Sequence, residues 1–297
     1  RDWASISGAF NRLIPKTFCT NWHIHERIMS DSIPKSWEDQ VVEAMQQFAI
    51  DYSVVYSKTE RQIAAHFEIG CLLSLVEFYE KCDFTGTVSN PTKDGAYRYL
   101  TTPNGNPKNF SYMVMTKGTE QIEIRQQVRI SSHVGSDVSF TPDIVVFPHK
   151  TKINAKKDAD YAGGKRTFFF VHSREVIAAH ECKSMVPFPE LLVSFIGMLV
   201  AGHEWVEKDD LSDLLNDDGD HLAPCLFVGG SARSIHLRMI RGLKTAYPMN
   251  IVVGMHSGTW NLLGDKAALR RMNNPLRVEP SPGPHGSPAA GSLSGDA

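Results

Sequence analysis

The sequence has few cysteines, no long apolar run and almost no net charge. No two cysteines have CxxC spacing, so the sequence indicates neither a disulfide framework nor a structural zinc site. The five are scattered: Cys19, Cys71, Cys82, Cys182 and Cys225. This usage favours a reducing compartment, and we expect the cytoplasm. The most apolar stretch, 191–202, is shorter than the ~20 residues that a membrane span needs, so it predicts a buried core helix and no membrane partner.

The net charge of −2 excludes a whole-molecule electrostatic attraction to nucleic acid. The acidic residues are concentrated in 203–220, however, which leaves the rest of the chain mildly basic and compatible with a local basic face. Basic residues gather in a polar stretch at 149–166 and in an amphipathic helix expected at 232–246. The residues expected to contact phosphates from these two segments are Lys156, Lys157, Lys165, Arg166, Arg233 and Arg238.

Hydrophobic periodicity predicts two helices, a run of strands, a buried helix, and then strand, helix and strand. The first two helices are expected at 34–50 and 59–82, and the buried helix at 188–206. Strands are expected at 96–100, 110–115, 120–132, 141–148, 167–173, 174–185, 223–230 and 249–255. This order predicts an α/β fold with a mixed central sheet and helices on both faces.

Three parts of the chain are expected. Residues 1–58 form an N-terminal helical segment that packs on the core, and residues 59–272 form the main domain. Residues 273–297 are rich in Pro, Gly and Ser and are expected to be a disordered tail.

Two strands carry charges that an apolar environment does not tolerate unpaired. In "IAAHECKSM" (177–185), side-chain alternation places Glu181 and Lys183 on the same face of a strand. In "TPDIVVFP" (141–148), Asp143 stands at the start of a similar apolar run. A buried carboxylate costs several kcal/mol unless it is paired or bound to a metal. If the strands are neighbours, the two carboxylates would bind Mg²⁺ or Mn²⁺, and the lysine would lie beside the attacking water.

The two motifs "TPDIVV" and "HECK" together resemble the signature of the PD-(D/E)xK, or restriction-endonuclease-like, nuclease superfamily. Its core is a helix, a three-stranded meander, a helix and a further strand, which matches the order expected from residue 59 onward. The resemblance implies a restriction-endonuclease-like sheet and a metal-dependent nuclease that hydrolyses DNA, with RNA not excluded. It also implies a biological role in restriction, phage defence or DNA processing, and localisation to the cytoplasm, the nucleoid or the nucleus.

The resemblance also implies roles for individual residues. Asp143 and Glu181 would be metal ligands together with the backbone carbonyl of Cys182, and Lys183 would orient or activate the water. Many members of the superfamily add a glutamate from the first core helix, and Glu68 in "AAHFEIG" is the first candidate, with Glu77 second. The separation of Asp143 and Glu181 exceeds that of a tight hairpin, so the basic stretch 149–166 is expected to be an insertion at the hairpin tip.

Several other interpretations remain open. Glu181 and Lys183 could form a surface ion pair beside a strand-capping Asp143. The chain could also be a non-catalytic interaction module that keeps the nuclease fold and acts through a protein partner, and it could form a homodimer. His180 is expected to be a hydrogen-bonded core histidine.

Three further motifs could hold ligands. His23 and His25 could share a metal, and "HEWVE" (203–207) resembles a zinc-protease helix but lacks its second histidine. Gly229 and Gly230 open a predicted helix and could hold an anion there.

Overall fold

The computed structural model describes residues 36–52, 63–103, 105–157, 163, 166–208, 210–257 and 269–277. All of these residues belong to one compact unit, Lys35–Ala297. Three predicted features lie outside the described residues: the His23 and His25 pair, Lys165, and the part of the tail from 278 onward.

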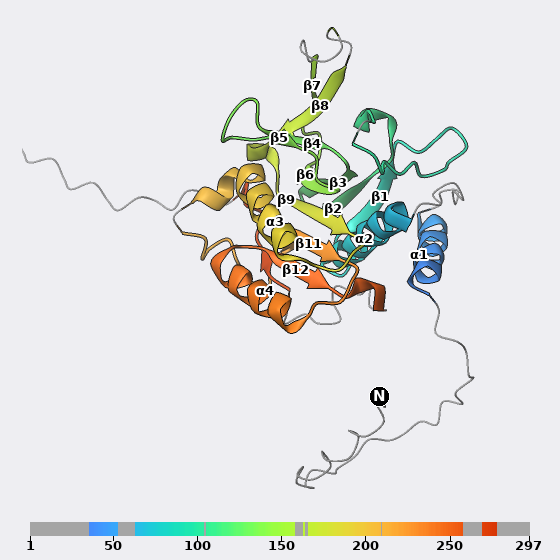
Figure 1. Cartoon of the computed structure of the whole chain (residues 1–297). Helices are drawn as coiled ribbons and strands as arrows, with labels where there is room; N and C mark the ends of the chain where they lie inside the picture. The colour runs from blue at the N-terminus through green and yellow to red at the C-terminus, as the bar shows by residue number, and fades with distance from the viewer. Residues whose placement is uncertain are drawn as a thin grey trace, which may run out of the picture. The chain divides into compact units, whose positions relative to one another are not determined.

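The centre of the molecule is a mixed sheet of seven strands in the order β1-β2-β3-β6-β9-β11-β12 (Figure 1). The strands are β1 (Thr85–Ser89), β2 (Tyr112–Lys117), β3 (Glu120–Gln126), β6 (Ile144–Pro148), β9 (Ala178–Lys183), β11 (Cys225–Val228) and β12 (Asn250–Val253). The strands from β1 to β9 are antiparallel to their neighbours, whereas β9, β11 and β12 run parallel. The prediction of an α/β fold with a mixed sheet flanked by helices is therefore confirmed.

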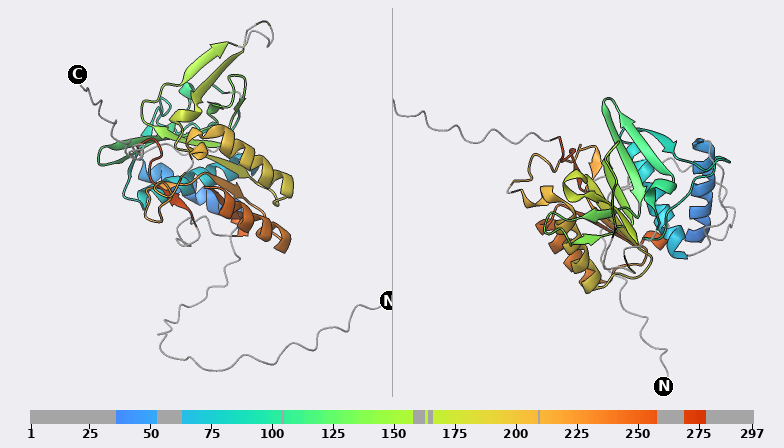
Figure 2. Two further views of the ribbon diagram at one scale, coloured as in Figure 1. Left: turned by 90° about the vertical axis from the view of Figure 1, so that its left-hand side faces the viewer. Right: turned by 90° about the horizontal axis from the view of Figure 1, so that it is seen from above.

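Helices cover both faces of this sheet (Figure 2). The four are α1 (Trp37–Asp51), α2 (Ile63–Glu80), α3 (Pro189–Gly202) and α4 (Ser234–Ala246). Helix α1 begins after Ser36, whose Oγ accepts a hydrogen bond of 3.1 Å from the backbone N–H of Asp39, the usual arrangement of a helix N-cap. Helix α2 packs between α1 and the sheet, which explains why it is apolar around most of its circumference. Helices α3 and α4 pack on the opposite face, over Leu226 and Val228 of β11.

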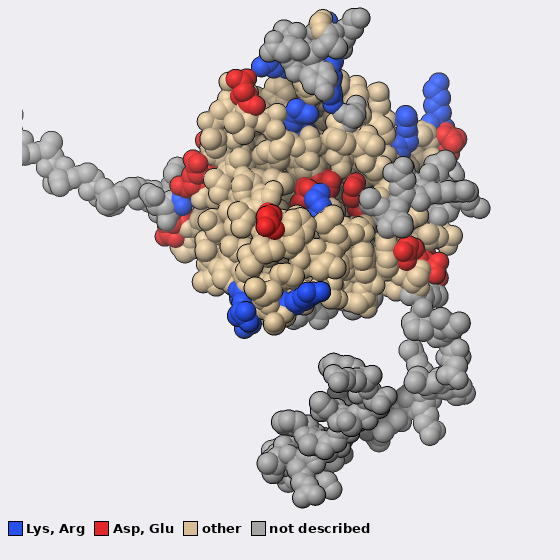
Figure 3. All heavy atoms as spheres, viewed as in Figure 1, with Lys and Arg blue, Asp and Glu red and all other residues tan. Residues whose placement is uncertain are grey.

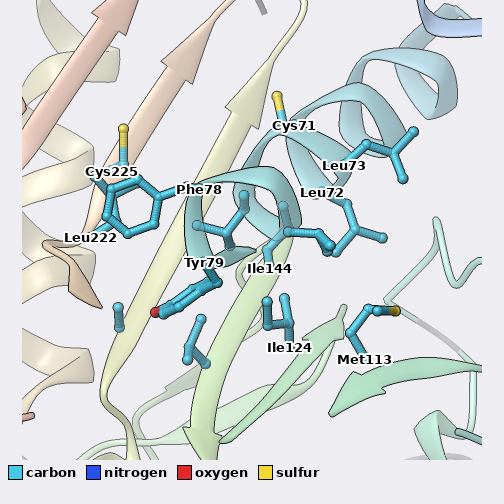
Figure 4. Close-up of a cluster of buried hydrophobic side chains, with 14 of the residues drawn as sticks. Cys71, Leu72, Leu73, Phe78, Tyr79, Met113, Ile124, Ile144, Leu222 and Cys225 are labelled. Atoms are coloured by element: carbon cyan, nitrogen blue, oxygen red, sulfur yellow. The ribbon is translucent and has the colours of Figure 1, made fainter. Parts of the chain in front are cut away.

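The main core lies between α2 and the sheet (Figure 4). Leu72 and Tyr79 of α2 contribute to it from the helix, and Ile124 and Ile144 contribute from β3 and β6. All four side chains are fully buried. This packing holds the middle strands of the sheet firmly, which matters because the charged residues lie at the ends of these strands.

A second, four-stranded sheet has the order β5-β4-β8-β7 and was not predicted. Its strands are β5 (Ser139–Phe140), β4 (Arg129–Ser131), β8 (Thr167–His172) and β7 (Asn154–Lys157). Ile130 and Val171 on its inner face pack against Val145, Phe147 and Ala179 of the central sheet. The small sheet and the pair of helices α3 and α4 thus share the same face of the central sheet.

The structure corrects several expected elements. Residues 120–132 form two strands in different sheets, because the backbone turns at Gln127 with a φ of 53°. The expected strand 96–100 is reduced to an isolated bridge at Ala96, although Tyr97 and Tyr99 lie in the core. Strand β1 was not predicted. The basic stretch 149–166 lies between the paired strands β6 and β9, as expected, and it contains strand β7, which pairs with β8 in the second sheet.

The remaining elements are short. They are the strands β10 (His221–Leu222) and β13 (Arg271–Met272), which pair with each other, and four 3-10 helices: η1 (Pro107–Asn109), η2 (Ser173–Glu175), η3 (Glu204–Glu207) and η4 (Met255–Ser257). The expected tail boundary at 273 differs from the structure, since Asn273 donates its backbone N–H to the carbonyl of Leu214. Within the described residues, no helix combines the length and the apolar character that a membrane crossing requires.

Candidate active site

The two charged strands are neighbours, and their register places the acids opposite each other. Ile144 of β6 pairs with His180 of β9, and Val145 pairs with Ala179. Because the strands are antiparallel, the residue before Ile144 faces the residue after His180. Asp143 and Glu181 therefore meet where β6 begins, although they are 38 residues apart in the sequence.

Lys183 lies between the two carboxylates. Its Nζ is 3.4 Å from Oδ2 of Asp143 and forms an ion pair with Oε1 of Glu181. The same Oδ2 of Asp143 accepts a hydrogen bond of 2.7 Å from the backbone N–H of Cys182. The structure thus brings Asp143, Glu181 and Lys183 together, and it fixes the aspartate through the backbone of β9.

Glu68 joins this cluster from helix α2 through a residue that sequence reasoning missed. The side-chain amide of Gln127 donates to Oδ1 of Asp143 at 2.9 Å and to Oε2 of Glu68 at 3.3 Å. Its backbone N–H also donates to the carbonyl of Asp143 at 3.0 Å. No local pattern in "RQQVR" distinguishes Gln127 from Gln126, so only the three-dimensional arrangement identifies it. Glu77, the second helix candidate, forms an exposed ion pair with Lys81 instead.

Burial and mutual repulsion perturb the acids. Burial, followed by the charge of Asp143, raises the pKa of Glu68 to about 8. The same two causes raise the pKa of Glu181, against the opposing effect of Lys183. Burial by itself would lower the pKa of Lys183, but the charges of Asp143 and Glu181 outweigh it and raise that pKa above its ordinary value. The lysine therefore stays charged, whereas burial and mutual repulsion disfavour the ionised forms of Glu68 and Glu181.

One oxygen of this site lacks a partner. Oε2 of Glu181 is buried and has no hydrogen-bond partner among the described residues. A buried carboxylate oxygen without a partner is costly, and a divalent cation would supply the missing interaction. No group of three His, Cys, Asp or Glu side chains has the arrangement of a metal site in the part of the chain that the structure describes. Mg²⁺ does not require one, because it commonly binds through one or two carboxylates, waters and substrate phosphate oxygens. The residues present therefore fit such an ion.

The carbonyl of Cys182 lies on the expected side of the strand. Within a strand, the N–H and the C=O of one residue point toward the same neighbour. Because the N–H of Cys182 points to Asp143, its carbonyl also faces the side on which the two acids meet. Figure 3 shows acidic and basic side chains together in a hollow near the end of β9, as located in Figure 1.

The other sequence candidates do not join this cluster. His203 is fully engaged, since its Nε2 accepts from the backbone N–H of Ala179 at 3.0 Å and its Nδ1 donates to the carbonyl of Leu199 at 2.8 Å. The backbone N–H groups of Gly229 and Gly230 donate to the carbonyls of Lys183 and Met185, so neither amide is available to an anion. Gly229 is needed for another reason, because a Cβ there would collide with the ring of His256.

His180 differs from its expected state. It is fully buried as predicted, but neither ring nitrogen has a hydrogen-bond partner among the described residues. Burial, reinforced by the nearby His203, lowers its pKa to about 3. The ring packs against Phe227, with 5.8 Å between the ring centroids. His180 is therefore uncharged and packs like an apolar side chain, although its two ring nitrogens have no hydrogen bond among the described residues to offset their burial.

The two groups of basic residues lie on separate elements. Lys156, Lys157 and Arg166 belong to the β7–β8 hairpin or its base, at the top of Figure 1. Arg233 caps the N-terminus of α4 and Arg238 is exposed on the same helix, at the bottom of that view. The structure thus does not unite the six expected phosphate-binding residues in one surface.

No family model, no curated protein and no solved structure matches the chain.

Proposed function

We propose that the chain is a metal-dependent nuclease that hydrolyses DNA phosphodiester bonds with Mg²⁺ or Mn²⁺. One observation carries this proposal: Asp143, Glu181 and Lys183 converge from paired strands, and a buried oxygen of Glu181 lacks a partner. An isolated pair of strand-end carboxylates with one lysine is poorly balanced as a structural ion pair. It is well suited to an oxygen-ligated cation and a negatively charged substrate.

The order of elements supports a restriction-endonuclease-like core. Helix α2 precedes the antiparallel strands β3, β6 and β9, then α3 follows, and β11 lies parallel beside β9. This is the order of helix, meander, helix and strand that the resemblance implies. The second sheet is an addition, inserted partly between β3 and β6 and partly between β6 and β9.

Each residue of the site has a distinct role in this proposal. Asp143 and Glu181 hold the metal ion, with the carbonyl of Cys182 and Glu68 completing its surroundings. When bound, the ion would supply neutralisation of the negative charge on the phosphoryl oxygens and a more acidic water. Lys183 holds the attacking water in line with the phosphorus and stabilises the charge that develops there. Gln127 keeps Asp143 and Glu68 oriented, as groups behind metal ligands commonly do.

The proposal is tested by incubating the purified chain with plasmid and with single-stranded DNA, in Mg²⁺, in Mn²⁺ and in EDTA. We expect cleavage with either metal, none in EDTA, and a rate lower by about 10²-fold or more for Lys183→Ala. A matched control is Lys81→Ala, which removes an exposed lysine that is also paired with a glutamate and directly follows α2. Cleavage that persists in EDTA, or that keeps the wild-type rate in Lys183→Ala, would refute the proposed function.

A non-catalytic interaction module is the second candidate, and one observation favours it. Three large apolar side chains directly after the site are solvent-exposed: Met185 by 46%, Val186 by 55% and Phe188 by 41%. Exposed apolar groups in succession are typical of protein interfaces. A chain that cleaves no DNA under any of these conditions, yet self-associates through this segment or binds a protein partner, would support this alternative.

A further inference from the structure

We infer that the outer face of the small sheet is a binding platform for a single-stranded segment of DNA. This inference deepens the proposed nuclease function by naming the form of its substrate. It rests on the residues of β4, β7 and β8 that point away from the central sheet, rather than on the acidic cluster.

The small sheet has one apolar face that is covered and one aromatic face that is not. Ile130 and Val171 point inward and pack on the central sheet. Their neighbours on alternate positions, Phe168 and Phe170 of β8, therefore point outward, and both are half-buried only. Two phenylalanines on the solvent side of a short sheet contribute nothing to the core. Their position needs another explanation.

Strand pairing surrounds these rings with cations. Lys156 of β7 lies beside Phe168, and Arg129 of β4 lies beside Phe170. The guanidinium carbon of Arg129 is 4.2 Å from the ring centroid of Phe168, and that of Arg166 is 5.0 Å from the same centroid. Contacts of this kind hold the guanidinium groups against the ring, and Arg129 also donates from Nη1 to Oγ of Ser139 at 3.3 Å. Because a guanidinium group has five N–H donors, it can contact a phosphate in addition to such partners.

The charged side chains on the strands of this face are all basic. None of the four strands of the small sheet contains Asp or Glu. The net charge of the whole chain is −2, so this accumulation of Lys and Arg does not follow from the composition. Figure 3 shows basic side chains around the β7–β8 hairpin at the top of the view. A polyanion is therefore the ligand that this surface fits.

The aromatic rings specify which polyanion. In a duplex the faces of the bases are covered by neighbouring base pairs, whereas unpaired bases can stack on phenyl rings and on guanidinium planes. The ring of Phe170 also meets that of His172 edge to face, with centroids 5.4 Å apart, which extends the row of flat groups along β8. Bases would stack along this row while the phosphates contact Arg129, Arg166 and Lys156.

The platform begins at the candidate active site. Arg129 of β4 is only two residues from Gln127, which holds Asp143 and Glu68. Gln127 lies at the turn where the chain leaves β3 for β4, two residues before the pair formed by Arg129 and Phe170. The N-terminal end of β4 is therefore the part of the platform closest in sequence to the acidic cluster, and we expect a bound strand of DNA to approach the acids from that end.

The test measures binding without cleavage. A fluorescently labelled oligothymidylate is titrated with the full chain in EDTA, and a duplex of mixed sequence is titrated in parallel. We expect tighter binding of the single strand than of the duplex. Because stacking is worth about 1–3 kcal/mol per base, the double variant Phe168→Leu with Phe170→Leu should weaken single-strand binding by roughly tenfold or more. Leucine preserves apolar volume, so the fold is expected to persist, which circular dichroism checks.

A matched control and a second variant sharpen the result. Phe110 is also half-buried, with Arg98 5.4 Å from its ring centroid, and it precedes β2 rather than lying on the small sheet, so Phe110→Leu should leave binding unchanged. Lys156→Ala should reduce the dependence of affinity on salt by about one unit of the logarithmic slope. Phe168→Trp with Phe170→Trp should restore binding.

Several outcomes would overturn the inference: equal affinity for duplex and single strand, unchanged affinity in the double leucine variant, or tighter binding of oligouridylate than of oligothymidylate, which would replace DNA by RNA. Failure here differs from failure of the proposed function. Single-strand binding without any metal-dependent cleavage would refute the nuclease function and support the binding platform. Metal-dependent cleavage, together with unchanged single-strand binding by the leucine variant, would support the nuclease function and refute the platform.

Discussion

Two strands of the central sheet carry almost the same motif, but the charged side chains of the two motifs have different partners. Strand β3 contains "EIR", with Glu123 and Arg125, and β9 contains "ECK", with Glu181 and Lys183. In each strand an acid and a base two positions apart share one face. Glu123 is 3% exposed and the Glu181 side chain 12%. Spacing therefore does not separate the two pairs, although the Lys183 side chain is 32% exposed and that of Arg125 only 10%.

The two pairs differ in the hydrogen-bond and ion-pair partners of their glutamates. Both oxygens of Glu123 are satisfied: Oε2 is 2.6 Å from Nε of Arg125, and Oε1 is 2.8 Å from Nδ1 of His149 and accepts from the backbone N–H of Lys150 at 3.0 Å. The guanidinium group of Arg125 in turn lies over the ring of Tyr112.

Glu181 has Lys183 on one oxygen, and its other oxygen is buried with no hydrogen-bond partner among the described residues. The like charge of Asp143 lies nearby. A saturated buried pair supports the fold, whereas an unsaturated one retains capacity for a ligand.

The largest expected difference between the two pairs is in catalysis. Lys183→Ala should lower the rate of metal-dependent cleavage by about 10²–10⁴-fold, the range for losing a group that handles the water. Asp143→Ala and Glu181→Ala should abolish detectable cleavage, because each removes a carboxylate of the metal site. Rates are measured on plasmid nicking per folded molecule. The paired substitution Arg125→Lys keeps the charge on β3 and should retain the wild-type rate; a comparable loss there would show that the two motifs are not distinct.

Stability should respond in the opposite sense. Glu123→Ala leaves Arg125 buried without its carboxylate and should cost about 3–5 kcal/mol of unfolding free energy. Glu181→Ala removes repulsion with Asp143 and a partnerless oxygen, so the apo protein should be unchanged or more stable. Urea unfolding in EDTA measures both, with the slope of the transition checked for constancy. A loss for Glu181→Ala as large as that for Glu123→Ala would mean that both pairs are structural.

The pH dependence of stability provides a third contrast. The pKa of Glu68 is about 8 in the folded protein and 4.5 ordinarily, so folding favours its protonated form. Its stabilising contribution is complete below pH 4.5 and is lost as the pH rises through about 8. Wild-type protein in EDTA should lose on the order of 1–3 kcal/mol over this window through the acidic site, and Glu68→Gln should flatten the curve. An equal slope in both proteins would contradict the assigned environment of Glu68.

The smallest expected effect belongs to Gln127. Gln127→Ala removes the amide that orients Asp143 and Glu68, and it should raise the Mg²⁺ concentration needed for half-maximal cleavage by about tenfold. The neighbouring Gln126→Ala is a close control, since the side-chain amide of Gln126 is buried and has no hydrogen-bond partner among the described residues. If the two variants behave alike, Gln127 contributes to the fold rather than to the position of the acids.

The sequence predicted the parts of this arrangement that depend on local periodicity. Alternation along 177–185 placed Glu181 and Lys183 on one face, the apolar run after Asp143 gave the second strand, and helical spacing offered Glu68. The structure brings all four together. Nothing local distinguished the "EIR" pair from the "ECK" pair, because the difference lies in His149 and Tyr112, which other segments supply.

The second sheet was beyond prediction for a related reason. Residues 120–132 alternate as one continuous strand, and only the positive φ of Gln127 sends the second half into another sheet. There β4 pairs in parallel with β8, about 40 residues later in the chain. Long-range parallel pairing leaves no trace in either segment alone. From the sequence alone, the half-exposed phenylalanines of β8 are therefore indistinguishable from ordinary strand residues.

The left-handed turn at Gln127 also connects the central sheet to the small sheet. The side-chain amide of Gln127 donates hydrogen bonds to both Asp143 and Glu68. Its backbone is the point at which the chain passes from one sheet to the other. A displacement of β4 therefore reaches Asp143 and Glu68 through the hydrogen bonds of Gln127. A ligand bound to the outer strands would in this way shift the positions of the carboxylates.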